Sequence, residues 1–224
     1  MQQVGNSQYA SRDDFPETIP VFPLVGALLL PNGNLPLNIF EPRYLQMVDD
    51  AMRGDKLIGM IQPSVSAGEE EIASGALSKI GCIGRITGWQ ETGQGQLHVN
   101  LTGICRFEVT SEVETDRMYR MVGFDLLDQD LTEMDANSTV DRKGLLEAFK
   151  NYLAANQMEA DWDSIKETDN DMLVNALCML SPFDPAEKQA FLEAPDLKTR
   201  ADTLIAVSEI YLARQGGDQE PSLQ

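Results

Sequence analysis

The segment IPVFPLVGALLLPNGNLPLNIFEPRYLQMV, residues 19–48, constrains the fold more than any other part of the chain. Residues 18–40 carry no charged side chain, although the net charge of the whole chain is −19. A membrane-spanning helix needs about 20 mostly apolar residues and an unbroken hydrogen-bond ladder. Because each proline removes a backbone donor and disfavours helix in the residue before it, the segment is predicted to be extended and buried. Its four prolines are Pro20, Pro23, Pro31 and Pro36.

Turn and helix signals follow one another within this segment. A short extended piece is expected over 21–24, and an apolar piece over 27–30 precedes the turn residues Pro-Asn-Gly-Asn. Asn-Gly between apolar runs is a strong hairpin signal, so residues 27–30 are predicted to pair with a strand over 35–40. Pro42 suits a first helical turn, and apolar residues recur at every fourth position. We expect strand, turn, strand and helix in this order.

The following part of the chain has the patterns of short strands. A buried strand is expected over 57–61, further strands over 80–90 and 97–109, and another over 119–127. Apolar and polar residues alternate from Leu97 onward, so that one face of the strand is buried and the other is wet. By this alternation, Arg106 is expected to face the solvent. Glycines within the strands indicate the bends of a small curled barrel.

The hydrophobic period changes from two to helical spacing after Thr139. Asp184, Pro185 and Glu187 form a capping-box pattern at the start of one of about four expected helices. We predict an α+β fold in two parts, a β-barrel with one or two helices followed by an α-helical bundle. The predicted divisions are a flexible N-terminus at 1–14, the barrel at 15–128, a linker at 129–138, the bundle at 139–215 and a flexible tail at 216–224.

Composition limits the partners and the compartment. Both halves are acidic, with 17 acids against 9 Lys/Arg in residues 1–128 and 19 against 8 in residues 129–224. Nucleic acids and anionic membranes bind clustered Lys/Arg, and the sequence has no such cluster, so neither is expected as a partner. The acidity itself favours solubility. Three cysteines without metal-ligand spacing and no leader pattern favour the cytoplasm, while the oligomeric state is not indicated.

The sequence shows no catalytic motif. Its one histidine, His98, lies at an outward strand position, where surface histidines are usual and acid–base partners are missing. Phosphate-binding loops, nucleophile elbows and paired metal-binding histidines are absent from the sequence. We therefore expect no catalytic residue, no metal and no cofactor.

Apolar and aromatic side chains remain as candidates for binding. Their most common role is to pack a barrel core, but apolar pockets and sheet edges also bind extended or unfolded peptides. The candidate peptide-binding residues are Phe22, Pro36, Phe40, Arg43, Tyr44 and Trp89.

Several of these motifs stand in the order known from one family. The stretches PVFPL, LLLPNGNLPL and IFEPRYLQMV, followed by IGCIGRITGW, GQLHVNLTGICRFEV and DPAEKQAFLEAPDLKTRADTL, resemble the N-terminal substrate-binding domain of ATP-dependent Lon proteases over about residues 15–215. The resemblance implies a PUA-like β-barrel followed by a helical bundle. Lon proteases continue into an ATPase module and a Ser–Lys peptidase, whereas this sequence stops at Gln224, so the resemblance is to the binding domain alone.

The resemblance implies a non-catalytic module that binds unfolded or extended polypeptide segments, as an adaptor or a quality-control factor. A protease or chaperone partner fits the same reading. Two alternatives stay open: a protein that binds a small molecule or nucleoside-type ligand, as PUA-like barrels do elsewhere, and an assembly partner of a full-length ATP-dependent protease.

Overall fold

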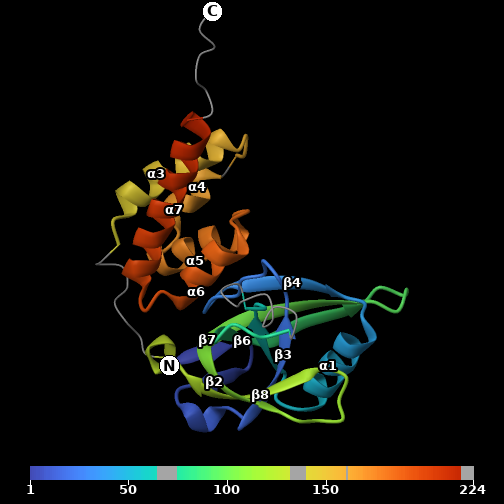
Figure 1. Ribbon diagram of the computed structural model, residues 1–224. Helices are drawn as coiled ribbons and strands as arrows, with labels where there is room; N and C mark the ends of the chain where they lie inside the picture. The colour runs from blue at the N-terminus through green and yellow to red at the C-terminus, as the bar shows by residue number, and fades with distance from the viewer. Residues whose placement is uncertain (65–74, 132–139, 160, 218–224) are drawn as a thin grey trace, which may run out of the picture.

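The protein is described by a computed structural model, which covers residues 1–64, 75–131, 140–159 and 161–217 (Figure 1). Strands occupy the first part of the chain and helices the second, which confirms the predicted α+β fold. The elements are β1 (Gln2–Val4), β2 (Ser7–Tyr9), η1 (Arg12–Asp14), β3 (Thr18–Pro23), β4 (Asn34–Ile39), α1 (Pro42–Arg53), β5 (Leu57–Ile61), β6 (Ile80–Glu91), β7 (Leu97–Val113), β8 (Arg120–Leu126), η2 (Asp128–Leu131), α3 (Arg142–Ala155), α4 (Trp162–Glu167), α5 (Asn170–Leu180), α6 (Pro185–Glu193) and α7 (Leu197–Gly217).

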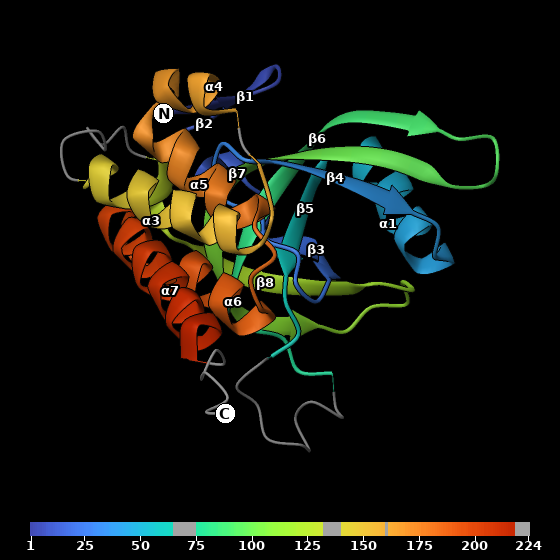
Figure 2. The same cartoon turned by 90° about the horizontal axis from the view of Figure 1, so that it is seen from above.

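Five of the strands close into a barrel. The sheet order is β4-β7-β6-β5-β3-β8, and an additional β7–β8 pairing joins the ring β7-β6-β5-β3-β8. The β3–β5 pairing is parallel, and the other pairings of the ring are antiparallel. Strand β4 lies outside this ring, because it pairs only with the first half of β7 among the described strands. The long β6–β7 hairpin extends away from helices α3–α7 in both views (Figures 1 and 2).

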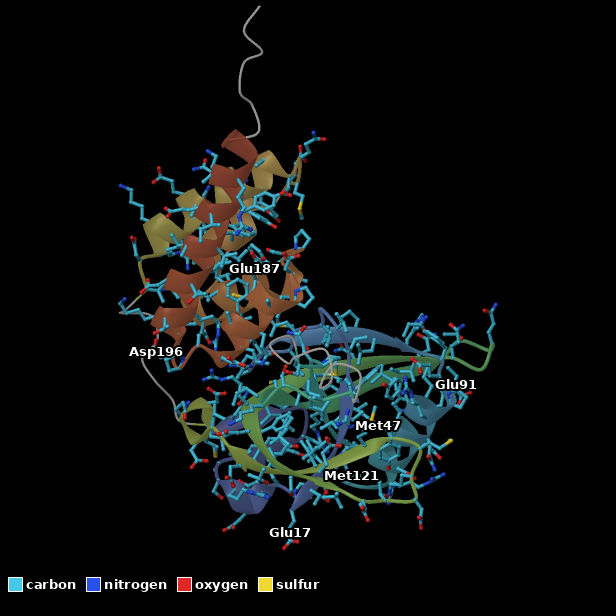
Figure 3. The ribbon with its side chains drawn as sticks, in the orientation of Figure 1. Glu17, Met47, Glu91, Met121, Glu187 and Asp196 are labelled. Carbon is cyan, nitrogen blue, oxygen red and sulfur yellow. The ribbon has the colours of Figure 1, made fainter. Side chains whose placement is uncertain are left out.

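Helix α1 begins at Pro42, as the sequence predicts, and buries one face in the hydrophobic core. Its buried residues are Tyr44, Met47, Val48 and Ala51. Met47, labelled in Figure 3, is fully buried in the larger of two hydrophobic clusters. The same cluster holds residues 28–30, which form an irregular segment rather than a strand. The centre of the apolar, proline-containing stretch is therefore buried in the core although it forms neither helix nor strand.

The predicted hairpin at Asn32–Gly33 is wrong. Strand β3 pairs with β5 and β8, β4 pairs with β7, and residues 27–30 belong to no strand. Asn32 nevertheless adopts a turn conformation with a φ of 63°, and its N–H donates to the Gly103 carbonyl at 3.0 Å. A Cβ at Gly103 would lie 2.1 Å from the Leu30 carbonyl oxygen. The turn thus directs the chain under β7, where only glycine leaves enough room.

The N-terminal residues also differ from the prediction of a flexible lead-in over 1–14. Strands β1 and β2 form an antiparallel hairpin, in which Val4 and Tyr9 are buried in the second hydrophobic cluster. The Arg85 guanidinium donates to the Tyr9 hydroxyl at 3.0 Å and to the Asn6 side chain at 3.1 Å. These residues are therefore ordered rather than flexible. Two apolar side chains, Val4 and Tyr9, are enough to anchor the hairpin because both are buried in the core.

Arg106 is the second correction, because it is 1% exposed rather than solvent-facing. It forms an ion pair with Asp130 at 2.8 Å. Its guanidinium also donates to the carbonyl oxygens of Leu192 at 2.9 Å and Pro195 at 3.3 Å, and to that of Ala194. Alternation along β7 fails here because η2 and the α6–α7 connection cover the strand. One buried side chain therefore joins the barrel to the helices.

The helical part begins at α3 within the described residues. Of the linker predicted over 129–138, residues 129–131 belong to η2, where Leu131 is buried, and the remainder lies outside the described residues. The capping box of α6 is confirmed, with the Glu187 carboxylate accepting from the Asp184 N–H at 2.9 Å. Helix α7 extends to Gly217, beyond the predicted end, and the remaining tail is outside the described range. Among the described helices, none has the length and apolar character needed to cross a membrane.

Candidate functional site

Two of the candidate aromatic residues are buried in the larger hydrophobic cluster. Phe22 and Tyr44 are each 6% exposed, and their ring centroids are 4.0 Å apart. Burial raises the pKa of the Tyr44 hydroxyl, with a smaller opposing effect of the Arg43 charge. The Arg43 guanidinium lies 4.6 Å from the centre of the Tyr44 ring and pairs with Glu41 at 2.7 Å. These aromatic rings are part of the core, so only Arg43 of this group has a largely accessible side chain.

The other three candidates lie on the surface. Phe40 is 62% exposed and Trp89 54% exposed, and Pro36 is exposed on β4. Phe40 directly follows β4, and Trp89 lies on β6 on the other side of the first half of β7. Pro36 shares a row with Asn100, whereas Trp89 shares the next row with Val99, so Pro36 and Trp89 project from opposite faces of this part of the sheet.

This part of the sheet, called here the uncharged sheet, consists of residues 34–39 of β4, 97–103 of β7 and 86–90 of β6. It contains no Asp, Glu, Lys or Arg, although these types make up 24% of the sequence. Glu91, at the outer end of the hairpin in Figure 3, is the first charged residue after it on β6. A three-stranded exposed surface without charge is unusual in a chain of net charge −19, because a solvated face normally carries charged side chains.

A groove of about 470 Å³ crosses the uncharged sheet. Strand register explains its position, because Pro36, Asn100 and Gly88 are partners in one row across the three strands. Gly88 has no side chain, so the row is shallow at this position. Steric crowding does not require the glycine, because an added Cβ would approach no atom closer than the Asn100 Cβ, at 3.7 Å. The groove is lined by Pro36, Leu37, Asn38, Gly88, Trp89, Gln90, His98, Val99 and Asn100.

Amide and hydroxyl groups provide the polar character of the surface. The Asn100 amide donates to the Thr87 hydroxyl at 3.3 Å, and the Thr102 hydroxyl donates to the Asn34 side chain at 2.8 Å. The Asn38 amide donates to the Gln96 side chain at 3.3 Å. Amides and hydroxyls of this kind both donate and accept, so the surface can hydrogen-bond to a peptide backbone without requiring a charged ligand.

Sequence reasoning did not find the amides of the groove, Asn38, Gln90 and Asn100. The alternation on β7 placed His98 and Asn100 on the wet face, but alternation alone does not reveal which strands lie on either side. The registers of β4–β7 and β6–β7 place Asn38 and Gln90 in one row with His98, and Leu37 and Trp89 in the neighbouring row with Val99, so the amides and the indole project from opposite faces of the same sheet. The sequence does show three separate segments without charge, residues 34–39, 86–90 and 97–103. They indicate a common surface only when strand pairing shows that they are neighbours.

The buried thiols have an environment unsuited to nucleophilic chemistry. Cys82, Cys105 and Cys178 are free and buried. Burial is the main cause that raises the pKa of each thiol, to about 12 for Cys178 and well above the ordinary value for Cys82. The thiolate is the nucleophilic form, so these residues remain protonated and act as packing. Within the described residues, no cluster of three or more His, Cys, Asp or Glu is arranged to hold a metal ion.

A second cavity, of about 340 Å³, lies between the barrel and the helices. It is lined by the buried Arg106 and Arg200 together with Asp130 and Asn175. The Arg200 guanidinium donates to the Asn175 side chain at 3.0 Å, and the Asn175 amide donates to the Pro31 carbonyl at 2.9 Å. Burial, followed by the charge of Arg106, lowers the pKa of Arg200. Arg106 and Asn175 already bond across the interface, so the cavity is chiefly a structural junction.

One protein-family model matches most of the length of the chain. The model of the family described as the ATP-dependent protease La (LON) substrate-binding domain matches residues 18–207. The Lon protease of Dictyoglomus thermophilum is 26% identical over 214 residues, which are 90% of this chain and 25% of that protein. The Lon protease of Desulfosudis oleivorans is 30% identical over 104 residues, 46% of this chain and 13% of that protein. The chain thus spans a quarter or less of the length of these relatives.

Solved structures share the fold. The Lon N-terminal domain protein from Xanthomonas campestris has a TM-score of 0.58 and 23% identity, covering 84% of this chain and 97% of that one. The N-terminal domain of the Mycobacterium avium complex Lon protease has a TM-score of 0.63 and 17% identity, covering 86% and 98%. At these identities, the likeness concerns the arrangement of barrel and helices.

Proposed function

Since the chain belongs to the family of LON substrate-binding domains, we propose that it is a non-catalytic module that binds extended or unfolded polypeptide segments. The uncharged sheet is the proposed binding surface, with Trp89 and Phe40 as its exposed aromatic anchors. Aromatic side chains supply large contact area in binding sites and are frequent hot spots. Arg43 and Tyr44 on α1, and Phe22 on β3, lie outside this proposed surface.

The observation that carries the proposal is the absence of charge on an exposed, grooved surface. Unfolded segments present apolar side chains and backbone amides, and both gain from a partner that combines aromatic rings with neutral hydrogen-bonding groups. Trp89 offers the first kind of contact on the face of Leu37 and Val99, and Asn38 and Asn100 offer the second kind on the opposite face. The acidic remainder of the surface supports solubility while such a segment is held.

Peptide arrays and photo-crosslinking to unfolded proteins test this proposal. We expect binding by the wild-type protein, and at least tenfold weaker binding by Phe40→Ala/Trp89→Ala, because hot-spot truncation costs about 2 kcal/mol or more. The matched control is Leu180→Ala/Ile210→Ala, which removes two apolar side chains that are 78% and 50% exposed on the helices. Equal binding by both double variants would remove the uncharged sheet from the proposal, and no binding by wild type would contradict the function itself.

The adaptor or quality-control role is a further part of the proposal. Binding without cleavage predicts that the purified 224-residue chain leaves an unfolded substrate protein intact and hydrolyses no nucleotide. Peptide fragments of the substrate, or released phosphate above the background of a mock purification, would contradict it. Affinity purification from the native host then distinguishes a general adaptor from an assembly partner of one full-length protease, since the latter recovers the same protease in stoichiometric amounts.

A small-molecule ligand is the second candidate function, and the cavity between barrel and helices is the observation that favours it. Its volume of about 340 Å³ is at the lower end of small-ligand pockets. A buried cation, Arg200, and a buried side-chain oxygen without a partner in the structure, Gln2 Oε1, line it. A thermal-shift screen with nucleosides and metabolites tests this candidate. A saturable rise in melting temperature that Arg200→Lys reduces would support it, and its absence for every compound would remove it.

A further inference from the structure

Among the described strands, none pairs with the outer edge of β4. Strand β4 pairs with β7 on one side, and the described part of the chain provides no strand on its other side. The closed ring formed by the other five strands has no such edge, apart from the end regions of long strands. An exposed edge is a template for pairing with another extended chain, which proteins usually block or cover. The open edge of β4 is therefore a candidate site for pairing with another extended chain.

The backbone direction along β4 follows from one hydrogen bond. The Gly103 N–H donates to the Gly33 carbonyl at 2.9 Å. Hydrogen-bonded and non-hydrogen-bonded pairs alternate in an antiparallel ladder, so Leu35 and Leu37 also direct their backbone groups toward β7 in the observed register. Asn34, Pro36 and Asn38 consequently direct theirs away from β7, toward the open edge.

The position of Pro36 agrees with this assignment. Proline has no N–H to donate and is found on strand edges where that position faces away from the ladder. The open edge thus offers the N–H groups of Asn34 and Asn38 and the carbonyls of Asn34, Pro36 and Asn38. Neighbouring donors are separated by four residues, which is about 13 Å along a strand. A second extended strand matches this spacing.

The side chains beside the edge define the chemistry of the occupant. On the core side, Leu35 and Leu37 are only partly buried and contact the main hydrophobic cluster. On the other side, the exposed residues are Pro36 and Asn38, with Phe40 after the strand. A strand added here would alternate between these two sides. It needs apolar residues at alternate positions to cover the leucines, and it meets no charge on the uncharged sheet.

A second copy of the chain is a poorer occupant than a foreign segment. In a two-fold symmetric β4–β4 pairing, each strand lacks the central N–H because of Pro36, so the centre of the ladder loses donors from both partners. A segment without proline supplies every donor on its own side. Hydrogen bonds that remain unmade in a buried interface cost more than they contribute when formed.

We propose that the uncharged sheet binds its polypeptide by strand addition: an extended, uncharged segment with apolar residues at alternate positions pairs with the open edge of β4. This inference rests on the proposed function and specifies its substrate class and its binding mode. Backbone hydrogen bonds at Asn34 and Asn38 fix the segment, and Leu35, Leu37 and Phe40 select apolar side chains. Strand addition is a recognised mode of peptide binding, in which backbone bonds give affinity and side-chain contacts give specificity.

Amide hydrogen exchange, read by NMR at single residues, tests the inference. The probe is a nine-residue peptide of alternating valine and serine, and its control carries N-methyl groups at alternate residues on the edge that would face β4. At a peptide concentration about ten times Kd, we expect the amides of Asn34 and Asn38 to exchange about tenfold more slowly. The amides of Leu35 and Leu37 already bond to β7 and should change little. The methylated control should bind at least tenfold more weakly.

The outcomes separate this inference from the function on which it rests. If peptide binds, as shown by saturable shifts of the Trp89 indole signal, but Asn34 and Asn38 gain no protection, strand addition is wrong and polypeptide binding stands. If neither this peptide nor an unfolded protein binds, the proposed function fails. Protection without peptide that increases with protein concentration would identify a second copy as the occupant and overturn the proposal. Pro36→Ala restores one donor, so it should tighten binding by about threefold to tenfold.

Discussion

The two halves of strand β7 have opposite surroundings. The second half pairs with β6 and β8 inside the closed ring, and its Arg106 bonds to three carbonyls beside α6 and α7. The first half pairs with β6 and with β4, whose other edge is open. One strand thus carries a buried, ion-paired junction at one end and an exposed, uncharged surface at the other. The fixed half can hold the open half in place because they share one backbone.

The comparison indicates how the molecule separates stability from binding. Substitutions in the closed half should lower the free energy of unfolding, because they remove buried bonds or overpack the core. Substitutions in the open half should leave that free energy nearly unchanged and alter binding.

Arg106→Ala should have the largest effect on stability. It leaves the Asp130 carboxylate buried and unpaired and releases the carbonyls of Leu192 and Pro195. Removing one member of a buried ion pair costs about 3–5 kcal/mol. Urea denaturation followed by circular dichroism measures the change. The matched control is Arg53→Ala, whose ion pairs on α1 are exposed and contribute little. A loss as small as that of the control would mean that Arg106 does not hold barrel and helices together.

Gly103→Ala should have the next largest effect. Its Cβ would lie 2.1 Å from the Leu30 carbonyl oxygen, so the backbone must shift. Overpacking of this kind costs about 1–3 kcal/mol. Gly88→Ala is the control from the open half, because its Cβ would approach no atom closer than 3.7 Å. Thermal unfolding of both variants measures the difference. Similar losses in the two would show that the halves are not distinct in packing.

Alkaline pH should act through the closed half. Burial, together with the nearby Asp130 charge, raises the pKa of Cys105 above its ordinary value of 9.0. The folded protein retains the thiol proton to a higher pH than the unfolded chain. This contribution to stability is therefore complete below the unfolded pKa and is lost as the pH rises toward the folded one. The loss is up to about 1.4 kcal/mol per pH unit for one thiol.

Cys105→Ala isolates that contribution. The free energy of unfolding should fall less in the variant than in wild type between about pH 8 and about pH 10, by about 1.4 kcal/mol. Urea titrations at the two pH values measure it, and the loss of volume affects both pH values equally. Parallel behaviour of variant and wild type would show that Cys105 titrates in the folded protein as it does in the unfolded chain.

Phe40→Ala and Trp89→Ala should have the smallest effect on stability, within about 0.5 kcal/mol, because both side chains are more than half exposed. Their effect belongs to binding. Tyr44→Phe is a useful contrast, since it retains the buried ring against Phe22 and removes only the hydroxyl. A loss of stability by either exposed-residue variant comparable to that of Gly103→Ala would contradict the division between the two halves.

Local patterns predicted much of this molecule, and pairing between distant segments decided the rest. The helix beginning at Pro42, the buried strand β5 and the capping box at Asp184 follow from nearby residues. The Asn-Gly turn was recognised, but residues 27–30 form no strand and β4 pairs with β7, a distant partner that no local signal specifies. Arg106 has the position of a wet residue and becomes buried because η2 and the α6–α7 connection cover it.

The sequence predicted which types of residue form the candidate site, but not which of them lie on the surface. Aromatic and proline residues were selected from one charge-free stretch and from Trp89, but aromatic character does not indicate whether a ring is inside or outside. Phe22 and Tyr44 therefore belong to the core, while Pro36, Phe40 and Trp89 lie on the surface. The amides of the groove and the open edge of β4 depend on strand register, which the sequence alone does not reveal.

The indole fluorescence of Trp89 provides the most direct test that the uncharged sheet binds polypeptide. The chain has two tryptophans, so a Trp162→Phe background leaves Trp89 as the single reporter, 54% exposed in the free protein. Titration with a reduced, unfolded protein that lacks tryptophan should shift its emission to shorter wavelength and saturate, because the ring becomes covered. Unchanged emission, while a separate binding assay shows the complex forming, would place the polypeptide elsewhere on the molecule and contradict the account.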